Sequence, residues 1–507
     1  MEDRMKEGMA LAMVLALGLL LRFYLASLDM TVLLPNLLSD DVFYYLKVAG
    51  NIASGVGASF DGINPTNGFH PMYALFLSLF YSLGSFGLEA PVRFSLMLLS
   101  VFDVLTGFVV YRIMLLPSFG SSRRAALVAC MFWVFNPFVV SGTFYGLETA
   151  MAVFLISIAV YSYVKTPVWA GFGGSLRLGV LLVAAMLARM DSVFLAAALA
   201  SDMLARKRFT AAFGTLAVAA VVCSPWLLWS YASFGMIQQD SGAVLSYING
   251  FNAGDFMSAS YVAAKLGGTY LAFRIAAMFF ASMALPLAFL LALRFFGGIE
   301  FGFKPRRLLL NFLSLFGLLL AAYYPMLMWG VTRRYYQPLL LLCALFVGLA
   351  FNAVARRRGA KMQALFVSLM LANLLFVGCF YWLYRPASPQ SWHLELYGAA
   401  QWISLNTPPS SRVGGFNSGI VGYFSNRTVT NLDGVINHNA YLAIVDRRLF
   451  DYVKSQNISY LVDGENTFNG ITPFMGDQDY KMKLREVYRS PLAGREGEYV
   501  VVYEVLY

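Results

Sequence analysis

The chain has 507 residues, of which 59% are hydrophobic and only 13% are charged. A water-soluble globule could not hide so much apolar surface, so the composition predicts a polytopic α-helical membrane protein. The formal net charge is +10, but the basic residues fall in short clusters between apolar runs, which indicates topology signals and excludes a nucleic-acid partner. The four cysteines lie within apolar runs without metal-ligand spacing, so we expect neither a disulfide nor a zinc site.

Apolar runs of about 20 residues, the length that crosses a bilayer, recur along residues 1–384, the predicted transmembrane domain. The first run lacks a small-residue cleavage site and is interpreted as a retained signal anchor. We expect eleven crossings, two of them short, at 8–28, 91–115, 125–143, 147–165, 177–189, 192–204, 209–231, 270–296, 308–328, 338–354 and 364–383.

Clusters of lysine and arginine set the predicted orientation, because cytoplasmic loops collect positive charge. Arg4 and Lys6 place the N-terminus in the cytoplasm. Five further basic clusters fall on the same side if residues 71–87, an apolar run of seventeen, do not cross. We therefore expect 71–87 to re-enter the membrane or to lie along its outer face. The alternative is an ordinary short crossing, with one other segment miscounted.

The first outer loop, residues 29–90, contains "SDDVFYYLKVAGNIASG", which predicts a helix that begins near Asp40. Capping that helix needs one acid, yet Asp40 and Asp41 are adjacent. Two carboxylates at a membrane surface suit a general base or a cation ligand, so both are candidate catalytic residues. The candidates for substrate binding in the same loop are Tyr44, Tyr45, Lys47, Asn67 and His70.

Two later features also lie on the outer side in this topology. Glu148 opens a crossing, where the helix macrodipole would stabilise it by roughly 0.3 to 1 kcal/mol, so helix capping and a catalytic role both explain it. Arg189 and Asp191 lie where two short crossings join, and either a structural ion pair or a substrate site explains them. The polar stretch 232–256 is compatible with a mobile loop near substrate or with a plain connector.

The sequence "WGVTRRYYQP" places Arg333 and Arg334 in a short outer loop, against the positive-inside rule. Arginine forks match phosphate oxygens, and Tyr335 suits the membrane interface. An anionic lipid head group is therefore the expected partner of this loop. The alternative is that the two arginines only anchor the loop to anionic lipids of the bilayer and bind no substrate.

A soluble domain is predicted over residues 385–507, where Pro, Ser, Asn and Gly replace the apolar runs. Helical patterns alternate there with short strand-like runs, which predicts a small α/β layer. The predicted strands are "RVGGF", "TVTNLDG", "ISYLVDG" and "EYVVVYEVLY". With eleven crossings this domain is extracytoplasmic.

Taken together, the acidic first loop, the later acid at the start of a crossing and the outer C-terminal domain resemble the GT-C superfamily of membrane glycosyltransferases. The superfamily includes protein O-mannosyltransferases, aminoarabinose transferases, arabinofuranosyltransferases and the oligosaccharyltransferase catalytic subunit. The nearest likeness is to its bacterial and archaeal members. "GLETAMAVF", "ARMDS" and "RRYYQP" resemble later landmarks of the group. The first-loop positions in step with the group are Asp40, Asp41, Tyr44, Ala49, Asn51, Gly55, Gly57, Asn67, Gly68, His70 and Pro71.

The resemblance implies an inverting transferase in the plasma membrane of a bacterium or archaeon. It would move a sugar from a polyprenyl-phosphate donor to a glycan, lipid or protein acceptor on the outer face. Asp40 or Asp41 would be the base, and the Arg333–Arg334 pair would hold the lipid phosphate. Glu148 would orient the acceptor or join Asp41 around a divalent cation, Mg or Mn, since some relatives use a metal and others do not.

Two other classes of function remain as alternatives. A flippase or transporter of lipid-linked sugars would also need many crossings and buried arginines, although no internal duplication is visible. A non-catalytic scaffold for envelope assembly would not need the acid pair. The outer domain lacks a WWDYG-like motif, so transfer of a large oligosaccharide to asparagine is not expected.

Overall fold

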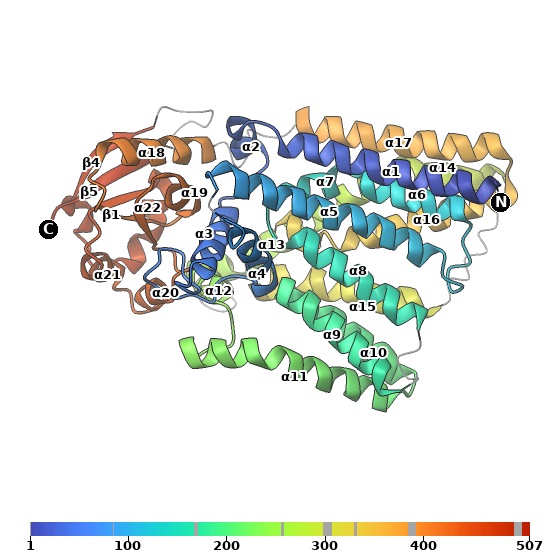
Figure 1. The fold of residues 1–507 in the computed structure, drawn as a ribbon, viewed down its shortest axis with the longest axis horizontal. Coiled ribbons are helices and arrows are strands. Elements are labelled where there is room, and N and C mark those ends of the chain that lie inside the picture. Colours follow the sequence, from blue (N-terminus) through green and yellow to red (C-terminus); the bar gives the residue numbers. More distant parts are fainter. Residues whose placement is uncertain are drawn as a thin grey trace.

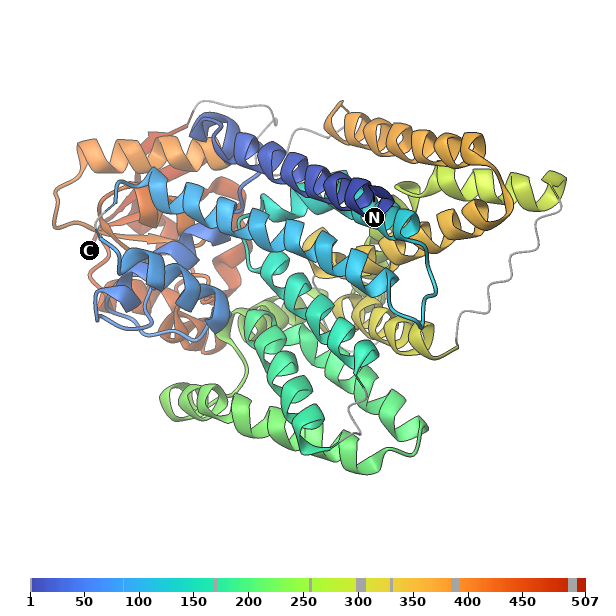
Figure 2. The same cartoon turned by 45° about the vertical axis from the view of Figure 1, so that its right-hand side comes forward.

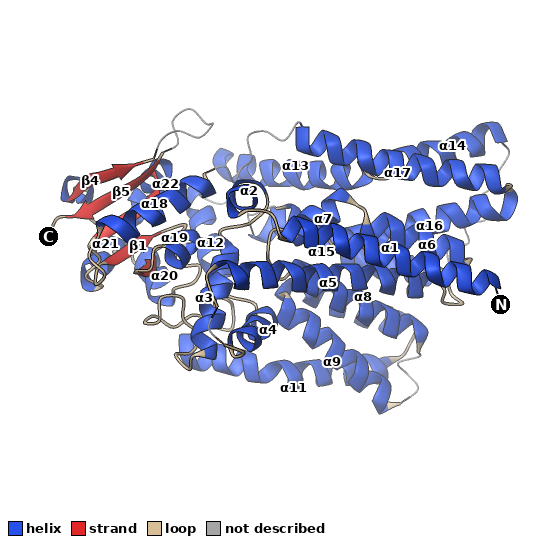
Figure 3. Cartoon of the chain, turned by 45° about the horizontal axis from the view of Figure 1, so that its top comes forward, coloured by secondary structure: helices blue, strands red, loops and turns tan. Residues whose placement is uncertain are grey.

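The computed structural model describes residues 2–84, 86–166, 171–254, 258–297, 307–328, 332–383, 392–490 and 499–507. Helices run lengthwise through the first three quarters of the chain, and the strands of the described residues gather at the C-terminal end (Figure 3). The N-terminus lies at one end of the helical bundle, and the C-terminal domain covers the other (Figure 1). The predicted class, a helical membrane protein with a small C-terminal α/β domain, is confirmed.

Most of the described residues before 384 belong to the helices of this bundle. In chain order they are α1 (Glu2–Ala26), α5 (Glu89–Met114), α6 (Arg123–Val134), α7 (Pro137–Thr143), α8 (Thr149–Lys165), α9 (Phe172–Ala188), α10 (Val193–Ala205), α11 (Phe209–Phe234), α13 (Ala259–Ala281), α14 (Ala284–Gly297), α15 (Arg307–Tyr323), α16 (Leu339–Arg357) and α17 (Ala360–Leu383).

Six described helices are long and apolar enough to cross a membrane, and the bent pair of α6 and α7 makes a seventh. Others are shorter; α8 and α9 have 17 residues each. At about 1.5 Å per residue such a helix spans roughly 25 Å, less than the hydrocarbon core of about 30 Å. The count of eleven crossings therefore stays a prediction.

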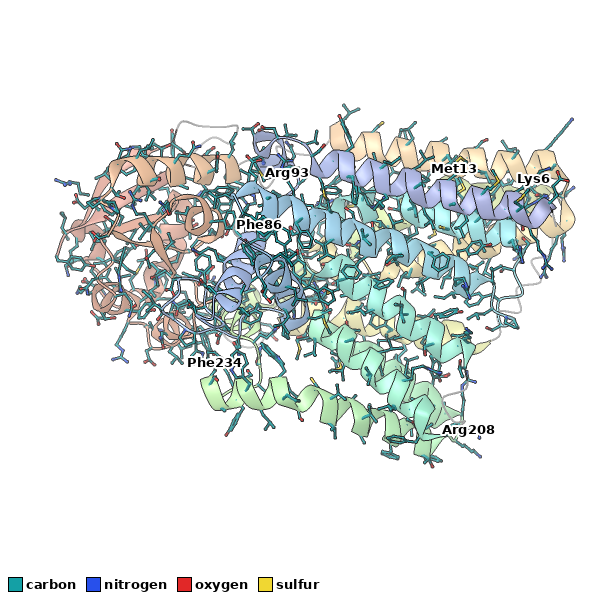
Figure 4. The ribbon with its side chains drawn as sticks, in the orientation of Figure 1. Lys6, Met13, Phe86, Arg93, Arg208 and Phe234 are labelled. Carbon is teal, nitrogen blue, oxygen red and sulfur yellow. The ribbon has the colours of Figure 1, made fainter. Side chains whose placement is uncertain are left out.

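Four labelled side chains mark the two ends of the bundle (Figure 4). Lys6 and Arg208 lie at the end that carries the N-terminus, whereas Arg93 and Phe234 lie nearer the C-terminal domain (Figure 4). The predicted orientation requires Lys6 and Arg208 to lie on the same side of the membrane.

Two shorter described helices, α3 (Asp41–Ala53) and α4 (Pro71–Tyr81), pack together between the bundle and the C-terminal domain (Figure 1). With 11 residues α4 is too short to cross a bilayer, which favours the non-crossing interpretation of 71–87.

The C-terminal sheet has the strand order β2-β1-β3-β5-β4, with β1 parallel to both of its neighbours and β5 antiparallel to β3 and β4. Four of these strands match the predicted runs, and β4 was not predicted. The chain leaves β1 toward β2 and later returns on the other side of β1. The carboxyl end of β1 is therefore a switch point, the place where open α/β sheets bind ligands. The strands are β1 (Arg412–Gly415), β2 (Thr428–Asn431), β3 (Tyr460–Gly464), β4 (Leu484–Arg489) and β5 (Val500–Val505).

Helices cover the faces of this sheet, and an outer helix of the bundle domain docks against one of them. The covering helices are α18 (His393–Asn406), α19 (Gly419–Phe424), α20 (His438–Val445), α21 (Leu449–Ser455) and α22 (Glu465–Ile471). The docked helix is α12 (Asp240–Ala253), which lies in the stretch expected to be a loop or connector. Tyr247 donates a hydrogen bond to the carbonyl of Val445 at 3.2 Å, and Phe251 packs on Phe474 with ring centroids 4.9 Å apart. Most of this stretch is therefore a domain contact.

A buried ion pair joins four bundle helices. Arg22 of α1 lies 2.6 Å from the carboxylate of Asp103 in α5, and neither side chain is more than 1% exposed. The same carboxylate accepts hydrogen bonds from Trp133 of α6 and Thr143 of α7, each at 3.0 Å. Because the two opposite charges are paired, the arginine and the carboxylate can persist among apolar side chains.

Candidate active site

Asp40 contacts the C-terminal domain. Its two carboxylate oxygens accept hydrogen bonds from the backbone N–H groups of Gly419 at 3.0 Å and Ile420 at 2.7 Å, at the start of α19. The residue is 6% exposed. A Cβ at position 419 would lie 2.3 Å from the carbonyl oxygen of Asp40, so the close approach requires glycine. Both oxygens are thus used in docking the two domains.

Tyr44 makes the next contact along the same face of α3. Its hydroxyl accepts from the N–H of Ser418 at 3.0 Å and donates to the carbonyl of Phe416 at 3.3 Å. Both partners lie in the turn between β1 and α19, so Asp40 and Tyr44 fill the crevice at the carboxyl end of that strand. The hydroxyl of Tyr44 is thus buried and paired with protein groups, and its part in substrate binding stays a prediction.

The docking contact carries a pH dependence. Burial raises the pKa of Asp40 from 3.8 to about 7, against the lowering effect of its two backbone donors. Because the folded pKa lies above the unfolded one, its stabilising contribution is complete below about pH 4 and is lost as the pH rises through about 7.

The thermal unfolding midpoint of the wild-type chain is accordingly expected to fall more between about pH 5 and about pH 8 than that of Asp40→Asn, which exchanges no proton here. Unfolding of both proteins in one detergent, followed by circular dichroism, measures the difference. Equal decreases in the two proteins would contradict the assignment.

Asp41 faces another direction. As the first residue of α3 its side chain is 44% exposed, and its carboxylate lies 3.2 Å from the guanidinium of Arg334. Asp41 lies near the beginning of the sequence of the bundle domain, and Arg334 lies near its end. Of the two adjacent acids, Asp41 is the accessible one.

A second ion-pair cluster lies beside this pair. Arg189 reaches Glu148 at 2.9 Å and Asp191 at 2.8 Å, and all three side chains are at most 10% exposed. Tyr324 accepts from Arg189 at 3.0 Å and donates to Asp191. His70 lies 3.8 Å from Glu148, and burial lowers the pKa of its imidazole, which favours the neutral form. The structure thus brings these four predicted residues together.

Tyr335 links the cluster to the Asp41 pair. Its ring stacks on Tyr324 with centroids 4.0 Å apart, and the guanidinium groups of Arg189 and Arg334 each lie 5.2 Å from its centre. Such cation–π contacts hold the planes of both arginines without using all their N–H donors. Arg334 therefore remains able to bind a further anion, whereas each nitrogen of Arg189 already donates to Glu148, Asp191 or Tyr324.

Arg333 is held in place by two tyrosines. One of its terminal nitrogens donates to the hydroxyl of Tyr145 at 2.7 Å, and its guanidinium lies 4.7 Å from the ring centre of Tyr381. Its other terminal nitrogen, Nη1, is buried without a hydrogen-bond partner. A buried, unpaired donor beside Arg334 suits a phosphate oxygen.

Several of these groups were not predicted from the sequence. Tyr145 lies three residues before Glu148, and only that proximity could have indicated it. Tyr324 and Tyr381 lie in apolar runs without any signal. Asp433 follows β2 in the "NLDG" run; burial raises the pKa of its carboxyl to about 8, and the negative charge of Asp41 adds to the shift. Its position adds a carboxyl from the C-terminal domain near the accessible base.

Two residues that the sequence predicted for substrate binding, Lys47 and Asn67, lie outside this cluster. A third, Tyr45, contacts the cluster through His70. Lys47 is near Asp61, away from the arginines, and burial lowers its pKa. Asn67 is fully buried; it donates to Ser230 and accepts from the N–H of Asp240, which ties down α12. Its side chain is thus paired with protein groups, and the role of Asn67 as a substrate ligand stays a prediction. Tyr45 accepts from the N–H of His70 at 3.2 Å and positions that residue.

The residues present do not fit a divalent cation. Asp41 and Glu148, the candidate ligands, each pair with an arginine. Among the described residues no group of three His, Cys, Asp or Glu side chains is placed to hold a metal ion. The positive charge that a metal would supply to these acids is supplied by Arg334 and Arg189.

Comparison with known proteins relates this arrangement to a fold. Residues 387–503 match a family model described as a domain of unknown function, DUF8728. No curated protein matches the chain by sequence.

Solved structures match nearly the whole length of this chain. The oligosaccharyltransferase of Archaeoglobus fulgidus, tethered with an acceptor peptide, has a TM-score of 0.59 at 14% identity over 97% of this chain and 74% of that one. ArnT from Cupriavidus metallidurans bound to undecaprenyl phosphate has a TM-score of 0.58 at 12% identity over 97% of both chains.

The arabinofuranosyltransferase AftD from Mycobacteria also matches, with a TM-score of 0.50 at 15% identity over 98% of this chain and 41% of that one. All three are GT-C glycosyltransferases. This chain has the GT-C fold. Within its GT-C fold, Asp41, Glu148 and Arg334 meet where the bundle joins the C-terminal domain. The GT-C resemblance inferred from the sequence is confirmed.

Proposed function

We propose that this chain is a membrane glycosyltransferase that moves a sugar from a polyprenyl-phosphate donor to an acceptor hydroxyl, with inversion at the anomeric carbon. The observation that carries the proposal is the 3.2 Å contact between the exposed carboxylate of Asp41 and Arg334. This contact puts an accessible base next to a phosphate-binding cation. Transfer from a lipid phosphate to a hydroxyl needs both groups.

The proposed reaction has one displacement step. The acceptor oxygen attacks the anomeric carbon while its proton passes to the carboxylate of Asp41. The bond between the anomeric carbon and the phosphate oxygen breaks, and the electron pair leaves with the lipid phosphate. Arg333 and Arg334 stabilise that departing negative charge. Attack from the face opposite the phosphate accounts for inversion.

We assign Glu148 a positioning role, in contrast to the proton transfer assigned to Asp41. It is buried and paired with Arg189, so it is poorly placed to accept a proton from an acceptor. We assign the cluster of Glu148, Arg189 and Asp191 to holding Tyr335, and hence Arg334, in place. His70, neutral and with a buried nitrogen that lacks a partner, is assigned to a sugar hydroxyl.

Ligands of the related structures support a lipid donor. ArnT was solved bound to undecaprenyl phosphate, and the archaeal oligosaccharyltransferase in complex with an inhibitory peptide and a dolichol-phosphate. Both lipids are polyprenyl phosphates. The unpaired nitrogen of Arg333 provides a donor for such a phosphate in this chain.

The test is transfer itself. Purified protein in vesicles is supplied with radiolabelled sugar on undecaprenyl phosphate and with a mixture of envelope glycans, lipids and peptides. Label leaving the lipid for an acceptor supports the proposal. Movement of labelled lipid across the bilayer without any transfer would show a flippase instead. A mass spectrum of the copurifying lipid identifies the donor.

Transfer is expected to proceed without a divalent cation, because each candidate ligand is already neutralised by an arginine. Treatment with EDTA should leave the rate unchanged, and added Mg²⁺ or Mn²⁺ should not raise it. Loss of activity with EDTA that is restored by one of these ions would contradict this assignment. The archaeal oligosaccharyltransferase, solved also with zinc and sulfate, is a suitable comparison for the chelation protocol.

A further inference from the structure

The chain turns sharply after β2, and this turn, residues 431–435, contacts the first loop of the bundle domain at two places. At its start the side chain of Asn431 donates to the hydroxyl of Tyr44 in α3 at 3.4 Å. At its end the carbonyl oxygen of Val435 would lie only 1.9 Å from a Cβ on Gly68, so glycine is required there. Figure 2 shows α3 and α4, in blue, directly against the C-terminal domain, as in Figure 1. We call this segment the 431–435 turn.

These two contacts hold Asp433 beside the candidate active site. Tyr44 follows Asp41 by three residues on α3, and Gly68 precedes His70 by two. The backbone of Asp433, the middle residue of the turn, is therefore held between the start of α3 and the loop that carries His70. The residue is half-buried, so it is not sealed from solvent.

The 431–435 turn itself does not require an acid. Oδ1 of Asp433 accepts from the N–H of Val435 at 2.9 Å, and the N–H of Gly434 donates to the side-chain oxygen of Asn431 at 3.1 Å. An asparagine at position 433 would close the same Asx turn without the cost of a partly buried charge. A carboxyl at this position therefore calls for a second partner.

The carboxyl of Asp433 has the chemistry of a group that binds hydroxyls. Burial raises its pKa to about 8, and the negative charge of Asp41 contributes to the rise. Near neutral pH the group is mainly the protonated acid, which donates through its O–H and accepts through its carbonyl oxygen. A sugar hydroxyl offers the complementary acceptor and donor. Because the charge of Asp41 acts on Asp433, the two carboxyl groups lie close enough to bind neighbouring hydroxyls of one molecule.

We infer that Asp433 binds a second hydroxyl of the acceptor, next to the hydroxyl whose proton passes to Asp41, and that the acceptor is a saccharide with two adjacent free hydroxyls. The inference rests on the proposed function and adds the class of acceptor. The saccharide is free or attached to a lipid or a protein. A lone hydroxyl, such as that of a serine side chain, would leave Asp433 without its partner. Asp433 exchanges no proton in the net reaction, so it determines specificity and does not act as a base.

Chemical removal of adjacent hydroxyls tests the class of acceptor. The mixture of envelope glycans, lipids and peptides is divided, and one half is oxidised with periodate, which cleaves adjacent diols, and then reduced with borohydride. Transfer of label from undecaprenyl phosphate to the treated half should fall at least about tenfold. Undiminished transfer would overturn the inference and leave the proposed function in place. If label leaves the lipid for neither half, the proposed function fails, and this inference fails with it.

Competition by two small alcohols tests the second hydroxyl directly. Transfer to the untreated mixture is measured with trans-1,2-cyclohexanediol or with cyclohexanol, which has one hydroxyl fewer. The diol should compete about fivefold more strongly with the wild-type chain, the value of one hydrogen bond. Asp433→Ala should remove this difference, whereas damage to the turn would weaken competition by both alcohols alike. Equal competition by the two alcohols with the wild-type chain, for which no variant needs to fold, would overturn the inference.

Kinetics of the variants assign the effect to the acceptor. Asp433→Ala should raise the concentration of the glycan mixture that gives half-maximal transfer about tenfold, with the KM for the lipid-linked donor unchanged. Asp433→Asn keeps the turn, a donor and an acceptor, and should retain most of the transfer. Asp451→Ala removes an aspartate of the same domain whose side chain is 69% exposed, and should change neither value. An unchanged acceptor requirement in Asp433→Ala would overturn the role of Asp433.

Discussion

Replacement of Asp41 by asparagine is expected to lower the rate of sugar transfer by about 10² to 10⁴-fold, the usual contribution of a general base. The amide has the shape of the carboxylate but cannot take the proton of the acceptor. Stability should change little, because the pair with Arg334 is partly exposed and such pairs are worth about 0 to 1 kcal/mol. The initial rate with the lipid-linked donor measures the first effect, and the unfolding midpoint measures the second.

Asp40→Asn is the matched control one residue away. Asparagine offers one oxygen and one NH₂ group to the two backbone donors of α19, so one N–H loses its acceptor. A cost of about 1 to 3 kcal/mol in stability is expected, with transfer retained at temperatures where the variant is folded. If Asp40→Asn abolishes transfer while Asp41→Asn retains it, the roles of the two acids are reversed. If both retain it, neither is the base.

The largest expected effect on stability comes from the buried ion pair between α1 and α5. Asp103→Asn leaves the guanidinium of Arg22 charged and fully buried without its anion. Such a change should lower the free energy of unfolding by about 3 to 5 kcal/mol. Equilibrium unfolding in mixed micelles measures the difference.

Two further variants separate this cause from general damage to the bundle. The double variant Arg22→Leu with Asp103→Leu removes both charges and should recover most of the loss. Glu89→Gln breaks a pair with Arg93 in which Glu89 is 55% exposed, and should cost at most about 1 kcal/mol. A double variant no more stable than Asp103→Asn would show that packing, and not the unpaired charge, causes the effect.

Features set by local pattern could be predicted from the sequence. The apolar runs gave most of the bundle helices, and four short β-branched runs gave β1, β2, β3 and β5. The acids and arginines between the apolar runs could be identified because charge next to a membrane is costly and needs a reason. In the structure Asp41 pairs with Arg334, and Glu148 pairs with Arg189 beside them.

Features set by distant partners could not be predicted. Asp40 and Asp41 are equivalent in the sequence, and only the position of α19, almost 380 residues away, separates the docked acid from the accessible one. The contact of Asn67 with Asp240 could not be predicted either, because a backbone partner gives no signal in the sequence. Arg22 and Asp103 each lie in an apolar run, and their pairing depends on how α1 packs on α5. These contacts depend on tertiary packing, on which local pattern carries no information.

The crevice at the end of β1 has a mechanical consequence. Its occupant is Asp40, and the next residue along the backbone is the proposed base. One peptide bond therefore ties the C-terminal domain to the reacting centre, without a linker to absorb strain. Any rocking of that domain, for instance as an acceptor arrives or a product departs, would be transmitted as a displacement of the Asp41 carboxylate relative to Arg334. The C-terminal domain would then act as a lever that sets when the base is aligned.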